Sequence, residues 1–114
     1  LPWGDLVKDA EDLALDIRAA IERRNEAELA ELAFHDPLTG LQNRRFLDDR
    51  LEELLRETEG GVAMVFVDLD DFKAVNDTHG HDVGDAVLVA VSKRLTHSAR
   101  SEDVVVRFGG DEFI

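Results

Sequence analysis

The chain has 114 residues, of which 44% are hydrophobic and 34% charged, a composition typical of one globular domain. Its 26 acidic residues against 13 Lys and Arg give a formal net charge of −13. Such a surface repels nucleic acids and anionic lipids, so neither is expected as a partner. The absence of cysteine excludes disulfides and thiolate metal sites and fits a cytoplasmic location, and no apolar run is long enough to span a membrane.

The N-terminal part predicts a long helix. Residues 5 to about 34 contain neither Gly nor Pro and are rich in Ala, Leu, Glu and Arg. Apolar residues recur at seven-residue spacing, but Arg24 and Glu31 interrupt the repeat. We interpret residues 1–34 as a signalling helix that forms a parallel, dimeric coiled coil with two possible registers. The alternative is a linker helix without a switch.

A second helix and a buried strand are predicted next. Pro37 ends the first helix, and Asn43 is expected to cap a helix from residue 44 to about 57. The continuous apolar run over residues 62–67 predicts a strand buried on both faces. Asp68, Asp70 and Asp71 follow it directly. The carboxyl end of a strand is where such sheets commonly carry their binding and catalytic residues.

The remaining elements lead to a glycine turn. The sequence predicts a short helical turn over residues 72–76, a loop over 77–81, a helix from a cap at Asp82 to about residue 99, and a strand over 103–106. Gly109 and Gly110 are expected to supply the positive φ angles of a tight hairpin turn. Asp111 and Glu112 follow the turn.

Acidic residues from two predicted strands could form one site. If the hairpin pairs beside the central strand, Asp68 and either Asp111 or Glu112 lie close together. Carboxylates with a backbone carbonyl suit Mg²⁺ that shares phosphate ligands, and the helical turn after Asp71, with Lys73, favours phosphate. This predicts magnesium-dependent phosphoryl transfer or nucleotide binding. The alternative is an incidental cluster of acids in an acidic protein.

Three separated segments carry a family resemblance. They are Asp-Pro-Leu-Thr-Gly-Leu-Gln-Asn-Arg-Arg over residues 36–45, the acidic segment over residues 68–85, and Arg-Phe-Gly-Gly-Asp-Glu-Phe over residues 107–113. Together they resemble the GGDEF domain of the diguanylate cyclase family. The resemblance implies an α+β fold with a nucleotide-cyclase or palm-like sheet flanked by helices, and makes residues 35–114 the N-terminal part of the domain.

The resemblance also implies the reaction and its residues. Two GTP molecules would condense to cyclic di-GMP and two pyrophosphates across a homodimer, under an upstream sensory domain. Mg²⁺, or Mn²⁺, would be held by Asp68, the Leu69 carbonyl and Asp111, with Glu112 as base or second metal contact. The implied substrate-binding residues are Phe72, Lys73, Asn76, Asp85, Gly109 and Gly110.

Further positions are assigned by the same comparison of motifs. Asn76 and Asp85 would read guanine, and a carboxylate can indeed accept both N1–H and N2–H of that base. Arg100 and Asp103 match the family's RxxD site for the product cyclic di-GMP. Asp36, Asn43 and Arg45 are interpreted as structural.

The resemblance further implies that the family domain continues beyond the signature turn. We therefore expect this chain to be a piece of a longer protein and to be inactive alone. Two alternatives remain at this point: a regulatory module that binds GTP or cyclic di-GMP without turnover, or a dimerisation helix whose globular part is only a folded cap.

Overall fold

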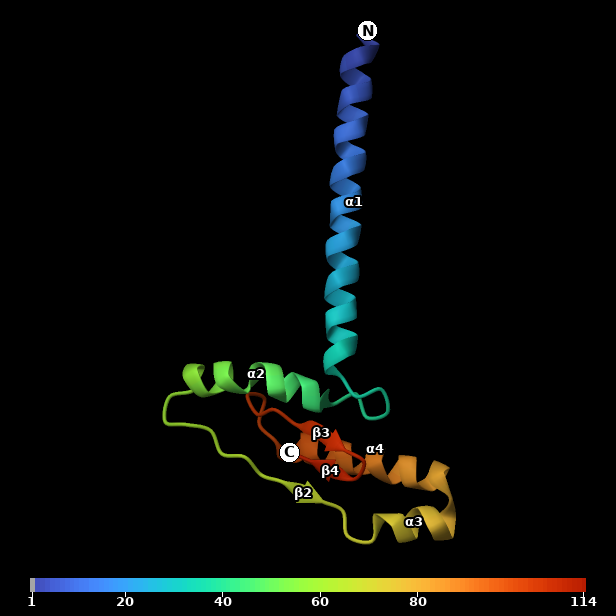
Figure 1. The fold of residues 1–114 in the computed structure, drawn as a ribbon, viewed down its shortest axis with the longest axis vertical. Coiled ribbons are helices and arrows are strands. Elements are labelled where there is room, and N and C mark those ends of the chain that lie inside the picture. Colours follow the sequence, from blue (N-terminus) through green and yellow to red (C-terminus); the bar gives the residue numbers. More distant parts are fainter. Residues whose placement is uncertain (1) are drawn as a thin grey trace. The chain divides into compact units, whose positions relative to one another are not determined.

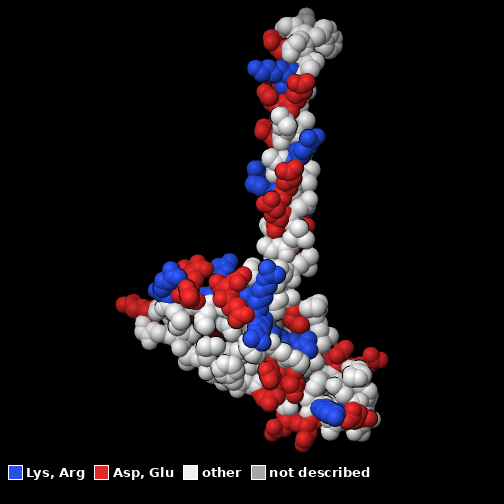
Figure 2. Space-filling view, viewed as in Figure 1, with Lys and Arg blue, Asp and Glu red and all other residues white. Residues whose placement is uncertain are grey.

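The structure is a computed structural model that describes residues 2–114 and divides into two compact units, residues 1–32 and 33–114. Helix α1 spans Trp3–Phe34 (Figure 1). None of its described residues is buried, and both acidic and basic side chains are distributed along it (Figure 2). The predicted long N-terminal helix is confirmed. Among the described helices, none is long and apolar enough to cross a membrane.

Helix α2, Arg44–Glu57, begins where its cap predicts. The Asn43 side-chain oxygen accepts a hydrogen bond from the Phe46 N–H at 3.0 Å, as an N-cap residue does. The Asn43 amide donates to the Ala33 carbonyl at 2.8 Å, and the rings of Phe34 and Phe46 meet edge to face at 6.1 Å. One side chain thus starts α2 and also holds the segment that precedes it.

The sheet has four strands in the order β1-β3-β4-β2. These strands are β1 Gln42–Asn43, β2 Val67–Asp68, β3 Val106–Gly109 and β4 Glu112–Phe113. β1 runs parallel to β3, whereas the β3–β4 and β4–β2 pairs are antiparallel. The fold is therefore α+β with a mixed sheet, and the predicted class is confirmed. The sequence did not predict β1, which takes up the end of the turn before α2.

The core of the second unit lies where the sheet meets α2 and α4. Phe113 and Val106, from neighbouring strands, are almost fully buried, and Leu47 of α2 and Leu88 of α4 are buried with them. Burial of such side chains stabilises the fold by about 2 kcal/mol each. The two central strands therefore anchor the hairpin that carries Asp111 and Glu112.

The predicted strand over residues 62–67 is mostly wrong. Only Val67 and Asp68 join the sheet, and residues 61–66 form no helix or strand. Val65 and Phe66 are 68% and 69% exposed. The register explains this, because Val67 pairs with Phe113 at the end of β4, so residues 62–66 have no neighbouring strand among the described residues. In Figure 1 this segment runs separately from α2 to β2.

Helix α3, Phe72–His79, replaces the predicted short helical turn and most of the predicted loop, whereas the predicted last helix is present as α4, His81–Ser98. Gly80 alone separates them, with φ 88° and ψ 163°. Residues other than glycine rarely adopt this conformation, so the helices break at this position. The predicted Asp82 cap is wrong, because α4 already begins at His81 and no side chain caps it.

The hairpin also departs from its prediction. Gly109 and Gly110 do not have positive φ angles, and the turn residues are Gly110 and Asp111. Arg107 pairs with Phe113 whereas Gly109 pairs with Glu112, so β3 carries one extra residue, Phe108. This bulge bends the strand and increases its local twist. The predicted strand over residues 103–106 begins only at Val106.

The Arg107 side chain ties the hairpin to the turn that precedes β1. Its guanidinium lies 3.1 and 3.2 Å from the two Asp36 oxygens and donates two hydrogen bonds to the Gly110 carbonyl. Both side chains of this pair are largely buried, with 17% and 15% exposure. Burial raises the pKa of Asp36, but the hydrogen bonds from Thr39 and Arg107 and the Arg107 charge outweigh it, so that its pKa lies below the ordinary value.

Two valines test the described packing. Val106→Ala should lower the free energy of unfolding by about 2 kcal/mol, since Val106 is 1% exposed and its methyl groups leave a cavity. The matched change Val65→Ala, at 68% exposure, should cost less than about 0.5 kcal/mol. Urea unfolding of the chain measures both. Equal losses would mean that residues 62–66 pack as a buried strand after all.

A second prediction concerns acid stability. Asp36→Asn should lower the free energy of unfolding by roughly 2 kcal/mol at neutral pH, because Arg107 loses its partner. Because the pKa of Asp36 is lowered in the folded protein, its contribution to stability is fully present above the unfolded-state pKa of about 3.9. This contribution is lost as the pH falls through the folded-state pKa. The difference in free energy of unfolding between Asp36→Asn and the unaltered protein, measured by urea unfolding, should therefore decrease below about pH 4. The exposed Asp48→Asn is the control. A difference in the free energy of unfolding that persists unchanged at pH 3, about one unit below the unfolded-state pKa, would contradict the role of the Asp36–Arg107 pair.

Candidate functional site

Strands β2 and β4 bring the predicted acidic residues together. Asp68 lies directly opposite Glu112 in the antiparallel ladder, a position that places the Cβ atoms about 5 Å apart and on one face. The next residue, Leu69, donates its N–H to the Asp111 carbonyl at 3.2 Å. Asp68 and Glu112 are exposed and Asp111 is half-buried. Pairing of the hairpin with the strand that ends at Asp68, as the sequence predicts, therefore brings both carboxyl-bearing segments together. The predicted central position of that strand is wrong, because β2 is an outer strand of the described sheet.

The donor set fits a metal that takes part of its coordination from a ligand. Among residues 2–114, no three His or acidic side chains converge closely enough to hold a metal by themselves. Mg²⁺ is commonly bound through only one or two carboxylates, with phosphates and water completing its six oxygens. Asp68 and the 111–112 pair can supply those carboxylates. The Leu69 carbonyl lies next to them, in the turn that leads to α3.

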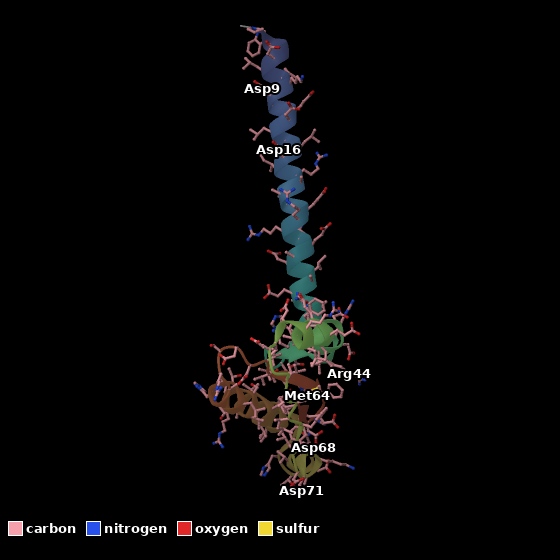
Figure 3. The ribbon with its side chains drawn as sticks, turned by 90° about the vertical axis from the view of Figure 1, so that its left-hand side faces the viewer. Asp9, Asp16, Arg44, Met64, Asp68 and Asp71 are labelled. Carbon is pink, nitrogen blue, oxygen red and sulfur yellow. The ribbon has the colours of Figure 1, made fainter. Side chains whose placement is uncertain are left out.

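The turn between β2 and α3 carries the residues predicted to meet phosphate. Asp71 adopts a left-handed conformation, with φ 56°, and it makes no side-chain hydrogen bond to cap α3. The chain therefore turns at Asp71 before α3 begins; Figure 3 labels Asp68 in β2 and Asp71 at the start of α3. Phe72 is half-buried and Lys73 is exposed at the first turn of α3. An exposed lysine at a helix start can approach an anion.

Helices α3 and α4 bring together the residues predicted to read guanine. Asn76 is half-buried in the second turn of α3, and Asp85 is exposed near the start of α4. Gly80 connects them, since its N–H donates to the Asn76 carbonyl and its own carbonyl accepts from the Gly84 N–H. Buried Gly84, next to Asp85, packs against the Asn76 side chain. The sequence assigned no role to Gly84.

The glycine turn borders a pocket of about 430 Å³ on the side of α2. A Cβ atom added to Gly110 would meet nothing within 4 Å, so this side of the turn is open to a ligand. Arg44 lies 4.6 Å above the Phe108 ring within the pocket wall. The full lining is Ala33, Asp36, Asn43, Arg44, Arg45, Arg107, Phe108, Gly109 and Gly110. Of the predicted site residues only the two glycines contribute, and the bulge at Phe108 is what directs this ring to Arg44.

The predicted product site is a separate turn between α4 and β3. The Asp103 side chain accepts a hydrogen bond from the Arg100 N–H at 2.9 Å, and the Asp103 N–H donates to the Arg100 carbonyl at 3.1 Å. Both residues are exposed. The carboxylate thus holds the backbone of the turn and retains acceptor capacity for a ligand.

Comparison with known proteins extends the match across the second unit. The family profile described as "Diguanylate cyclase, GGDEF domain" matches residues 33–114. MucR of Pseudomonas aeruginosa, a bifunctional diguanylate cyclase/cyclic di-GMP phosphodiesterase, is 47% identical over 94 residues, which cover 80% of this chain and 14% of MucR. The response regulator PleD of Caulobacter vibrioides is 38% identical over 117 residues, covering 93% of this chain and 26% of PleD. The chain thus spans only a minor part of the length of these relatives.

A solved structure shares both the fold and the N-terminal helical extension. It contains the coiled coil and GGDEF domain of DgcB from Caulobacter crescentus in complex with c-di-GMP. The TM-score is 0.72 at 34% identity, and the match covers 90% of this chain and 56% of that chain. Sequence profile, relatives and fold agree, and the chain belongs to the GGDEF-domain family of diguanylate cyclases.

Proposed function

We propose that this chain is part of a diguanylate cyclase that condenses two GTP molecules to cyclic di-GMP and two pyrophosphates. The observation that carries the proposal is the β2–β4 register, in which Asp68 faces Glu112 and Leu69 bonds to Asp111. This register gathers the acids of two family motifs at one edge of the sheet. Both acids of the signature turn are present, which supports turnover over a purely regulatory role.

In the proposed reaction the 3′-oxygen of each GTP attacks the α-phosphorus of the other. The bond from that phosphorus to the bridging oxygen breaks, and pyrophosphate leaves. Glu112 would take the 3′-hydroxyl proton, and its exposure beside Asp68 supports this role. Mg²⁺ or Mn²⁺ bound by Asp68, the Leu69 carbonyl and Asp111 would supply charge stabilisation at the phosphates.

The remaining residues bind and orient the nucleotide. Phe72 and Lys73 would contact phosphate at the start of α3, while Asn76 and Asp85 would hydrogen-bond the guanine edge. Gly109 and Gly110 would let the nucleotide lie against the backbone. Contact at Gly110 is sterically open in the described turn.

Two nucleotides must meet, so the proposal includes a homodimer. Helix α1 supports it, because the large apolar side chains Leu6, Leu13 and Ile17, which share one face at seven- and four-residue spacing, are exposed along a helix of about 48 Å. A parallel coiled coil would bury them. We propose residues 1–34 as this signalling helix, residues 35–114 as the GGDEF portion, an upstream sensory domain as the source of control, and the cytoplasm as the location.

Glu112→Gln tests the proposed base. In the full-length protein with GTP and Mg²⁺, this change should lower cyclic di-GMP formation at least about 100-fold, because an amide cannot accept the proton. Mass spectrometry of the nucleotide products measures it. The exposed Glu59→Gln is the matched control and should keep the wild-type rate.

The same experiment separates the two functions. Calorimetric binding of GTP to the unaltered protein without any cyclic di-GMP product would favour the regulatory module. A Glu112→Gln protein with wild-type turnover would mean that Glu112 is not the base and that the roles of the acidic residues differ from those proposed.

The RxxD turn is proposed to bind product and inhibit the enzyme. Arg100→Ala should raise the cyclic di-GMP concentration needed for half-inhibition about tenfold, the loss of one charged hydrogen bond. It is a cleaner test than Asp103→Ala, which would also release the Arg100 N–H and loosen the turn. Inhibition assays with Arg94→Ala, an exposed arginine on α4, provide the control. An unchanged half-inhibition value for Arg100→Ala would rule out the site.

A further inference from the structure

Helices α3 and α4 pack against one another at Gly84. A Cβ atom built on this glycine would overlap the Asn76 Oδ1 atom and lie 2.9 Å from Asn76 Cγ and 3.4 Å from Phe72 Cζ. Real Cβ atoms essentially never come within 3.0 Å of such neighbours. Gly84 has no positive φ, so its backbone would accept other residues, and it is the Asn76 carboxamide that leaves no room for a side chain here.

We propose that Gly84 is a positioning residue for guanine recognition. Because it has no side chain, the Asn76 carboxamide can lie against the α4 backbone, which fixes where its NH₂ group points. This inference rests on the proposed function, since it takes Asn76 and Asp85 to be the residues that read the base.

The geometry shows why the contact controls direction. Phe72 and Asn76 are four residues apart on α3 and therefore share the helix face that meets Gly84. With Oδ1 against Gly84, the NH₂ group, a hydrogen-bond donor, is the end of the carboxamide left for a ligand. Asp85, the next residue on α4, supplies an acceptor. A donor and an acceptor are thereby set side by side from two helices, which is what recognition of a base edge requires.

A methyl group at residue 84 leaves two outcomes, and both disturb this pair. The Asn76 side chain can rotate away, or α3 and α4 can separate. Separation is restricted, because the single residue Gly80 joins the helices and is hydrogen-bonded to both Asn76 and Gly84. We therefore expect Asn76 to move, and a misplaced hydrogen-bonding group at a recognition site lowers the preference for the correct base.

The test uses four variants of the full-length protein: Gly84→Ala, Asn76→Ala, the double variant, and Gly4→Ala. Gly4 lies in α1, and a Cβ atom there would meet nothing within 4 Å, so it is the matched control. The measured quantities are Tm and the ratio of dissociation constants for the α,β-methylene analogues of ATP and GTP in Mg²⁺. Asn76→Ala should reduce this ratio about tenfold, the loss of one charged or polar hydrogen bond at the base.

Gly84→Ala should reduce the ratio by a similar factor and lower Tm. The double variant should recover part of the Tm, because the overlapping carboxamide is gone, while its ratio matches that of Asn76→Ala alone. Such non-additivity is expected only if Gly84 acts through Asn76. Gly4→Ala should leave the ratio unchanged.

Other results would overturn the proposal. A folded Gly84→Ala protein with the wild-type ratio, or losses that multiply in the double variant, would mean that Gly84 does not act through Asn76. If Gly84→Ala and the double variant both fail to fold while Asn76→Ala folds, the obstacle is not the Asn76 side chain. A wild-type protein that does not prefer the guanosine analogue would instead contradict the proposed function, and absence of Tm recovery in the double variant would separately refute the contact.

Discussion

The second unit depends on the guanidinium of Arg107. It joins Asp36, in the turn before β1, to the Gly110 carbonyl, in the hairpin turn, through a largely buried ion pair and four hydrogen bonds. Since 71 positions separate Asp36 from Arg107, this contact closes the chain around α2, α3 and α4 together with the β1–β3 pairing. An arginine fork suits this task because its donors have fixed directions. This contact helps to position Asp111 and Glu112, which the buried strands β3 and β4 also hold in place.

Local chemistry made the helices predictable. Asn43 has the side chain of an N-cap, and α2 begins directly after it. The run without Gly or Pro in α1 and the apolar spacing of α4 likewise gave the right element types. The site could be placed for a similar reason, because acids that follow one strand and leave a hairpin turn must meet once those strands pair. The roles assigned to the individual residues remain predictions.

Most of the failures concern contacts between segments that are far apart in the sequence. The apolar run over residues 62–66 has strand composition, yet a strand needs a neighbour, and the ladder with β4 ends at Val67. The glycines at 109 and 110 suggested a turn with positive φ, but the bulge at Phe108 moved the turn one residue onward. Gly84 went unnoticed because its importance comes from a contact between two helices. These three misses concern pairing or packing across the chain, whereas the limits of α3 and α4 at Gly80 were missed locally.

The corner at Gly80 limits how the length of this protein can vary. α3 ends at His79 and α4 begins at His81, and the one residue between them bonds to the carbonyl of Asn76 and the N–H of Gly84. One inserted or deleted residue would rotate α4 by about 100° about its axis, because a helix turns once in 3.6 residues. That rotation would carry Asp85 away from Asn76. Insertions should therefore be tolerated in the exposed segment before β2 but excluded from this corner, so that chain length there is as constrained as residue identity.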